Sequence, residues 1–148
     1  MTTLELAHIS MHDDGKSLQL GVDVSNTSAR RLYACASVAA LRYETATRLL
    51  AVELVPAKRG TAPGNYVLPK IVTIEAQQRV QITVTVPRII ARLGSTVAGA
   101  SAPIERLPAH EAAQVEISLA WSDTRLEPTR TDPEAWTQGI VRGRSTLS

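Results

Sequence analysis

Apolar and polar residues alternate at every second position in three separate stretches of this chain. Leu18, Leu20, Val22 and Val24 alternate with polar or small residues, and the same spacing recurs over 80–86 and 115–121. Successive side chains of a β-strand point to opposite faces, so each stretch would bury one face and expose the other. This pattern is typical of antiparallel sheets that are packed on one side and solvated on the other.

Weaker strand patterns surround these three stretches. Residues 3–11 alternate and then slip by one position, which predicts a β-bulge. A long apolar stretch over 32–43 shifts phase near Ala39-Ala40 and leads into a predicted hairpin over 41–54. A short strand is expected over 70–75, while 88–93 is compatible with a helical turn or with an edge segment.

Turn signals separate the predicted strands. Asp14-Gly15 predicts a tight hairpin in which both residues have a positive φ. Residues 56–69 contain three prolines and two glycines and indicate a loop. Residues 94–113 form the longest stretch without a strand pattern, and a loop of this length often has a function.

About seven or eight short strands with turns between them predict a two-sheet antiparallel sandwich with Greek-key connections. Over residues 3–122 the pattern resembles that of immunoglobulin-like and fibronectin-type-III-like domains. The paired cysteines of antibody domains are missing, because Cys35 is the only cysteine. A small closed or partly closed β-barrel is the alternative fold. We expect an all-β domain over 1–122 and an extended C-terminal tail over 123–148, docked on the domain or on a partner.

Length, charge and hydropathy narrow the class of protein. The chain has 148 residues, 44% of them hydrophobic and 20% charged, with a formal net charge of +2. This is the size of one globular domain that can form a core without disulfides. The first nine residues lack a signal-peptide pattern, and no apolar stretch approaches the roughly 20 residues of a membrane-spanning helix. With a single cysteine, these features predict a cytoplasmic protein without a membrane partner.

The residues that could bind a metal or catalyse a reaction are scattered. His8, His12, His110, Cys35 and Met11 include the ligand types of a blue-copper site, but their spacing does not match one. Cys35 lies in an apolar strand of small residues, which indicates a buried thiol rather than a nucleophile. The chain has no Gly-x-Ser-x-Gly elbow and no glycine-rich phosphate loop. We therefore assign no catalytic, cofactor or metal residues and expect no enzyme.

Nucleic-acid binding would require a broad basic surface with interleaved aromatic residues. The net charge is nearly balanced, and the nearest approach to such a pattern is Arg30-Arg31 beside Tyr33. Charged strand ends that face water explain these residues more simply. We therefore do not expect a nucleic-acid partner.

The C-terminal stretch supplies the candidate interaction residues. Trp136, Ile140, Val141 and Arg142 stand in an otherwise polar segment, where they would dock on the domain, on a second copy or on a foreign partner. We favour the first two, and predict a non-enzymatic interaction or assembly module acting through its sheet edges, loop 94–113 and this tail. A small-ligand-binding sandwich with a pocket under loops 56–69 and 94–113, and a hydrolase that uses His110, are the alternatives.

Overall fold

The computed structural model describes residues 3–56, 69–93, 104–126 and 133–147, and most of the regular structure in these ranges is β-strand. The expected all-β class is confirmed. Helical structure in these ranges is limited to one 3-10 turn, η1 (Ala109–Glu111), and one α-helical turn, α1 (Pro133–Trp136). The strands are β1 (Leu4–Asp13), β2 (Ser17–Asn26), β3 (Leu32–Cys35), β4 (Val38–Glu44), β5 (Leu49–Leu54), β6 (Ile71–Ile74), β7 (Arg79–Pro87), β8 (Ile90–Leu93), β9 (Ile104–Leu107), β10 (Gln114–Ser122) and β11 (Gly139–Thr146).

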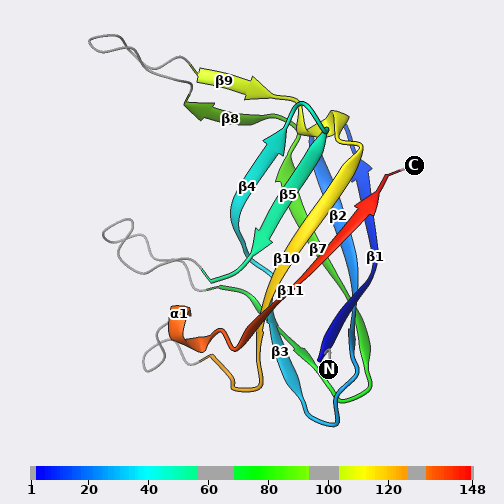
Figure 1. The fold of residues 1–148 in the computed structure, drawn as a ribbon, viewed down its shortest axis with the longest axis vertical. Coiled ribbons are helices and arrows are strands. Elements are labelled where there is room, and N and C mark those ends of the chain that lie inside the picture. Colours follow the sequence, from blue (N-terminus) through cyan, green and yellow to red (C-terminus); the bar gives the residue numbers. More distant parts are fainter. Residues whose placement is uncertain (1–2, 57–68, 94–103, 127–132, 148) are drawn as a thin grey trace.

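Two sheets face each other, and a two-stranded ribbon of β8 and β9 extends to one side (Figure 1). The small sheet has the order β1-β2-β7 and is antiparallel throughout. The large sheet has the order β4-β5-β10-β3-β6, with β11 along the other edge of β10. β5 runs parallel to β10, whereas β3 and β11 run antiparallel to it. The described strands do not close into a barrel, so the closed form of the alternative fold is wrong.

The core between the two sheets is made of the inward-facing residues of the alternating strands. Every inward residue of β2 is at most 1% exposed, and Val115, Ile117 and Leu119 of β10 are fully buried. β7 contributes every second residue to the same cluster. Each leucine, isoleucine or valine buried in this way stabilises the fold by roughly 1.5–3 kcal/mol relative to an exposed one. The predicted strands over 18–24, 80–86 and 115–121 are confirmed.

Both register slips that the sequence predicts occur in the structure. The pairing of β1 with β2 shifts between Leu6 and His8. The pairing of β4 with β5 shifts between Val38 and Ala40, where the predicted phase change lies. Each slip lets a strand keep its apolar residues on the core side after an irregular residue.

The turn between β1 and β2 differs from the expected one. Gly15 has a φ of 88°, but Asp14 is not among the residues with a positive φ. The Asp14 carboxylate instead accepts hydrogen bonds from the backbone N–H groups of Lys16 and Ser17, both at 2.8 Å. An aspartate that fixes the turn with its side chain needs only one left-handed residue after it.

The C-terminal segment, expected as a tail, contains a strand. β11 pairs with β10 from Gln114↔Thr146 to Trp121↔Gly139. Gly139 is required there because a Cβ at this position would lie 2.9 Å from the Trp121 ring.

The region 94–113 is only partly described. Residues 94–103 lie outside the described residues, and 104–111, which we expected as loop, contain β9 and η1.

A buried asparagine ties the two sheets together where β2 leads to β3 and β6 leads to β7. Asn26 is 1% exposed. Its Nδ2 donates to the carbonyl oxygens of Arg30, Ile74 and Glu75 at 2.7, 3.0 and 3.1 Å. Its Oδ1 accepts from the N–H and the hydroxyl of Ser28 at 3.0 and 2.7 Å. One side chain thereby holds the approach to β3 against the end of β6.

Replacing Asn26 should therefore destabilise the whole domain. We expect Asn26→Ala to lower the free energy of unfolding by about 2–3 kcal/mol, because it removes three hydrogen bonds to backbone carbonyl oxygens, each worth about 1 kcal/mol net. Ser28→Ala, which removes one partly buried hydroxyl, should cost no more than about 1 kcal/mol. Urea denaturation of both variants measures the difference, and equal small losses would contradict this role of Asn26.

Candidate functional site

The candidate site lies on the outer face of the β3–β6 pair. Tyr33 of β3 is paired with Thr73 of β6. Their neighbours Leu32, Ala34 and Ile74 point inward and are at most 1% exposed. Because side chains alternate along each strand, Tyr33 and Thr73 point away from the core.

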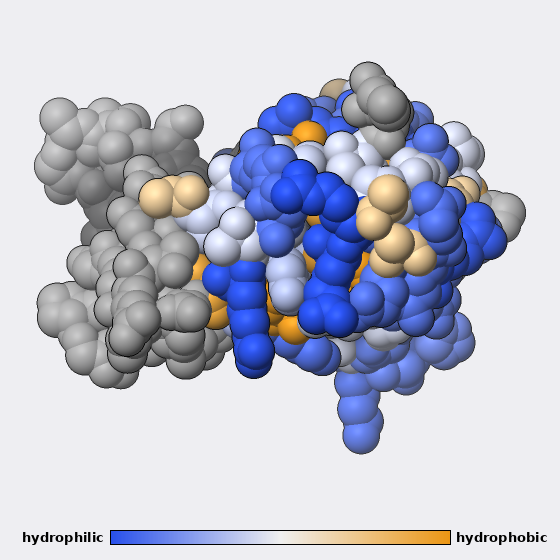
Figure 2. Space-filling model, turned by 90° about the horizontal axis from the view of Figure 1, so that it is seen from below, coloured by the Kyte–Doolittle hydropathy of each residue, from blue (hydrophilic) through white to orange (hydrophobic). Residues whose placement is uncertain are grey.

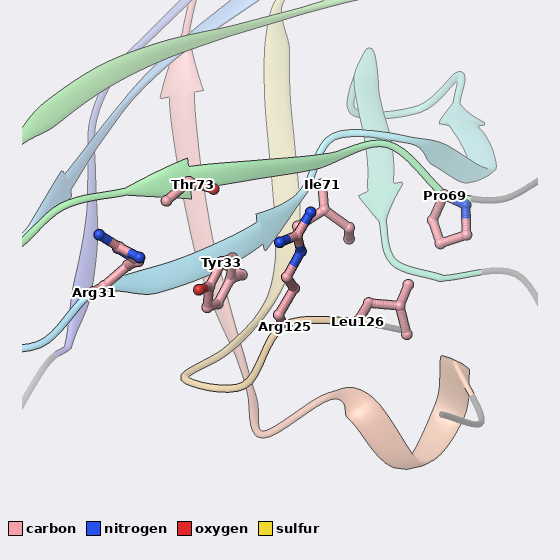
Figure 3. A pocket seen from close by; sticks show the side chains of 7 residues that line it. All are labelled: Arg31, Tyr33, Pro69, Ile71, Thr73, Arg125 and Leu126. Carbon is pink, nitrogen blue, oxygen red and sulfur yellow. The ribbon is translucent and has the colours of Figure 1, made fainter. Parts of the chain in front are cut away.

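A hollow of about 370 Å³ opens above this pair. Its walls come from β3, from β6 and from the chain that leaves β10, so three segments far apart in the sequence meet there (Figure 3). Arg31 and Arg125 flank the Tyr33 ring, while Pro69 and Leu126 lie at the end away from Arg31. The described lining residues are Arg31, Tyr33, Pro69, Ile71, Thr73, Arg125 and Leu126.

The end of the sandwich beside this hollow is strongly hydrophilic. Seen from below in Figure 2, hydrophilic side chains cover most of the described surface, and hydrophobic ones show mainly in recesses between them. Arg30 Nη1 lies 3.2 Å from Asp123 Oδ2, and Arg31 Nε lies 2.7 Å from Glu75 Oε1. Exposed ion pairs of this kind add little stability, but they set the position of the two arginines.

The charged residues that line the hollow are two arginines, of which Arg31 is paired with Glu75. The hydrogen bond from Arg31 to Glu75, and then that with the Tyr33 hydroxyl, raise the pKa of the Arg31 guanidinium, which stays charged. Arg125 has no ion-pair partner among the residues that the structure describes. None of the described lining residues carries a carboxylate. A bound group that neutralises this site would therefore be an anion.

The apolar wall of the hollow is supported by the C-terminal segment. Trp136, 4% exposed, packs with the fully buried Cys35 and Ala120 on the outer face of the large sheet. Its Nε1 donates to the carbonyl oxygen of Thr124 at 2.6 Å. Tyr33, Ile71 and Leu126 pack against this small cluster, so Trp136 supports the site without lining the hollow.

The free edge of β6 borders the same hollow. The Ala36 N–H donates to the Lys70 carbonyl oxygen at 2.7 Å. Because bonded and non-bonded pairs alternate in an antiparallel ladder, the even-numbered residues of β6 direct their backbone groups toward β3. Ile71 and Thr73 therefore present their N–H and C=O groups to the opposite edge, where no described strand pairs with β6.

The four interaction residues expected from the sequence take different places. Trp136 is buried in its own chain, and Val141 is partly buried against the core. Ile140, 45% exposed, and Arg142 point outward from β11 and line a separate hollow beside Pro56 and Ser118. The sequence pointed to Arg31 and Tyr33 only as a strand end, and no local pattern marks Arg125.

The residues considered for metal binding or catalysis form no metal-binding group in the described ranges. His8, Met11 and His110 line a hollow of about 540 Å³ between β1 and β11. No group of three or more His, Cys, Asp or Glu in the described ranges could hold a metal ion. His110 Nδ1 lies 3.2 Å from the backbone carbonyl oxygen of Arg88, and burial raises the pKa of the Cys35 thiol.

The expected ligand pocket under loops 56–69 and 94–113 involves residues outside the described ranges, namely 57–68 and 94–103. Pro56 and Pro69, which flank the first of these gaps, line two different hollows. No described residue of 104–113 lines either hollow. A ligand that touches both loops thus stays a prediction.

Searches of protein-family models, of curated proteins and of solved structures find no match to this chain. Among the described residues, no helix is long and apolar enough to cross a membrane.

The contact between Trp136 and Cys35 predicts how the thiol reacts. Native Cys35 should react slowly with Ellman's reagent, because it is buried and burial also disfavours the thiolate. Trp136→Ala should speed the reaction, whereas Ile140→Ala, an exposed change in the same segment, should not. Equal acceleration by both variants would show that Trp136 does not cover the thiol.

Proposed function

We propose that this protein is a non-enzymatic interaction module that binds an extended, acidic segment of a partner protein along β6. The observation that carries the proposal is a coincidence of two features. The residues that offer free backbone groups at the β6 edge, Ile71 and Thr73, also line the hollow that contains Arg125. A strand added to this edge would gain main-chain hydrogen bonds and side-chain contacts together, as in β-augmentation.

The chemistry of the hollow specifies the partner segment. Alternate side chains of an added strand point to the outer face of the large sheet, beside Ile71 and Thr73. Arg125, which has no described counter-ion, would pair with a carboxylate on the added strand. Arg31 is already paired with Glu75 and contributes little net charge. Leu126 and Pro69 would contact an aliphatic side chain. The preferred segment is thus extended, with an acidic and an aliphatic residue two positions apart, so that both side chains face the hollow.

We also infer an immunoglobulin-like topology for the scaffold. The antiparallel set β3-β10-β11 faces the antiparallel set β1-β2-β7, an arrangement that is similar to the CFG and ABE strands of immunoglobulin-like domains. Two departures bear on function. β6 pairs with β3 rather than with β7, and the β4–β5 hairpin extends the large sheet beyond β10, with β4 at the edge.

Selection from a random-peptide display library, followed by binding measurements on purified variants, tests the proposal. Selected peptides should be acidic and should bind Arg125→Glu at least about tenfold more weakly, as expected for one lost charge-assisted hydrogen bond. Thr73→Pro should have a similar effect, because it removes an N–H that faces the free edge while keeping the pairing with β3. Arg106→Glu, an exposed charge reversal on β9, is the matched control.

Two results would overturn the proposal: selection that yields no peptide, or peptides whose binding ignores both substitutions. Sensitivity to Arg125→Glu without sensitivity to Thr73→Pro would also reject strand addition, and would indicate a site for a free anion instead. Circular dichroism spectra of all variants verify that the fold is retained.

A further inference from the structure

β7 is an edge strand without the usual protection against association. It pairs with β2 over its nine residues without a register shift. No described strand pairs with its other edge. Natural edge strands carry charges, prolines or bulges that prevent pairing with another chain. Between Val80 and Val86, β7 has none of these.

The other edges of the sandwich are interrupted or covered. β1 contains the bulge between Leu6 and His8 and abuts β11, where a Cβ at Gly143 would lie 3.0 Å from Leu6. β4 contains a register shift and the ion pair of Arg42 with Glu44. β6 has only four residues. β7 is thus a long edge strand with neither a register shift nor a charged residue between Val80 and Val86.

The direction of the backbone groups of β7 follows from one hydrogen bond at its start. The Asn26 N–H donates to the Gln78 carbonyl oxygen at 2.9 Å. By alternation along the antiparallel ladder, the even-numbered residues of β7 bond to β2. Gln81, Thr83 and Thr85 therefore present their N–H and C=O groups to the free edge.

We propose that β7 pairs with β7 of a second copy of this chain, antiparallel and about a two-fold axis at Thr83. Thr83 would exchange two backbone hydrogen bonds with its own equivalent. Gln81 would exchange two with Thr85 of the other copy on each side of the axis. The small sheets then join into one continuous sheet with the order β1-β2-β7-β7-β2-β1.

The side chains of β7 fit this register with itself. On the core side, Ile82 lies opposite Val84 of the second copy, so apolar groups meet. On the outer face, Thr83 meets Thr83, and Gln81 meets Thr85. Like charges are never opposed, because Arg79 lies opposite Pro87 at the end of the pairing. A second copy is therefore the occupant that this edge fits, and the two-fold contact closes at a dimer.

Light scattering coupled to size-exclusion chromatography tests the dimer. The protein should have twice the chain mass of 15.9 kDa, and Thr83→Lys should reduce the mass to that of one chain, because two ammonium groups would meet at the axis. His12→Lys, an exposed change on β1 at the opposite edge of the small sheet, should leave the mass doubled. A single-chain mass for the unmodified protein, or a doubled mass for Thr83→Lys, overturns the proposal.

Amide hydrogen exchange on the unmodified protein gives a second test that does not depend on a variant folding. The N–H groups of Gln81, Thr83 and Thr85 should exchange slowly in concentrated solution and faster on dilution, as the dimer dissociates. Fast exchange of these three groups at all concentrations, with slow exchange of their even-numbered neighbours, would contradict the proposed pairing.

Discussion

The large sheet depends on the hydrogen bonding of β10. This strand pairs with β11 along one edge, and with β5 and then β3 along the other. Its inward residues Val115, Ile117 and Leu119 are fully buried, and the outward Ser118 and Ala120 are 8% and 0% exposed. A strand covered on both faces and paired on both edges fixes the positions of all its neighbours, so the rest of the sheet takes its register from β10.

The candidate binding hollow is a consequence of this arrangement. The last pairs of β10 hold β3, and β3 in turn holds β6. The chain that leaves β10 turns over the same strands and delivers Arg125 and Leu126 to the hollow. The segment then returns through Trp136 to form β11, which closes the other edge of β10. One strand thereby brings together three parts of the site that the sequence keeps apart.

Much of the fold could be predicted from the sequence, whereas the candidate site could not. Strict alternation marked β2, β7 and β10, because each has one face in an aliphatic core and one in water. The sequence pattern does not indicate β11. Gly139 and Gly143 occupy positions where close neighbours leave no room for a larger side chain, and these two glycines interrupt the apolar alternation. Arg31 and Arg125 become neighbours only through the pairing of β3 with β10, and periodicity carries no information about such long-range contacts.

Amide hydrogen exchange across the large sheet is the most direct measurement of the role given to β10. We expect the N–H groups of β10 to exchange more slowly than those of its neighbours, whether they face β5 or β11, and β11 to be protected together with them. Rapid exchange throughout 139–146, together with exposure of the β10 amides that face this segment, would contradict it. The C-terminal segment would then not be part of the sheet, and the support for the hollow would be lost.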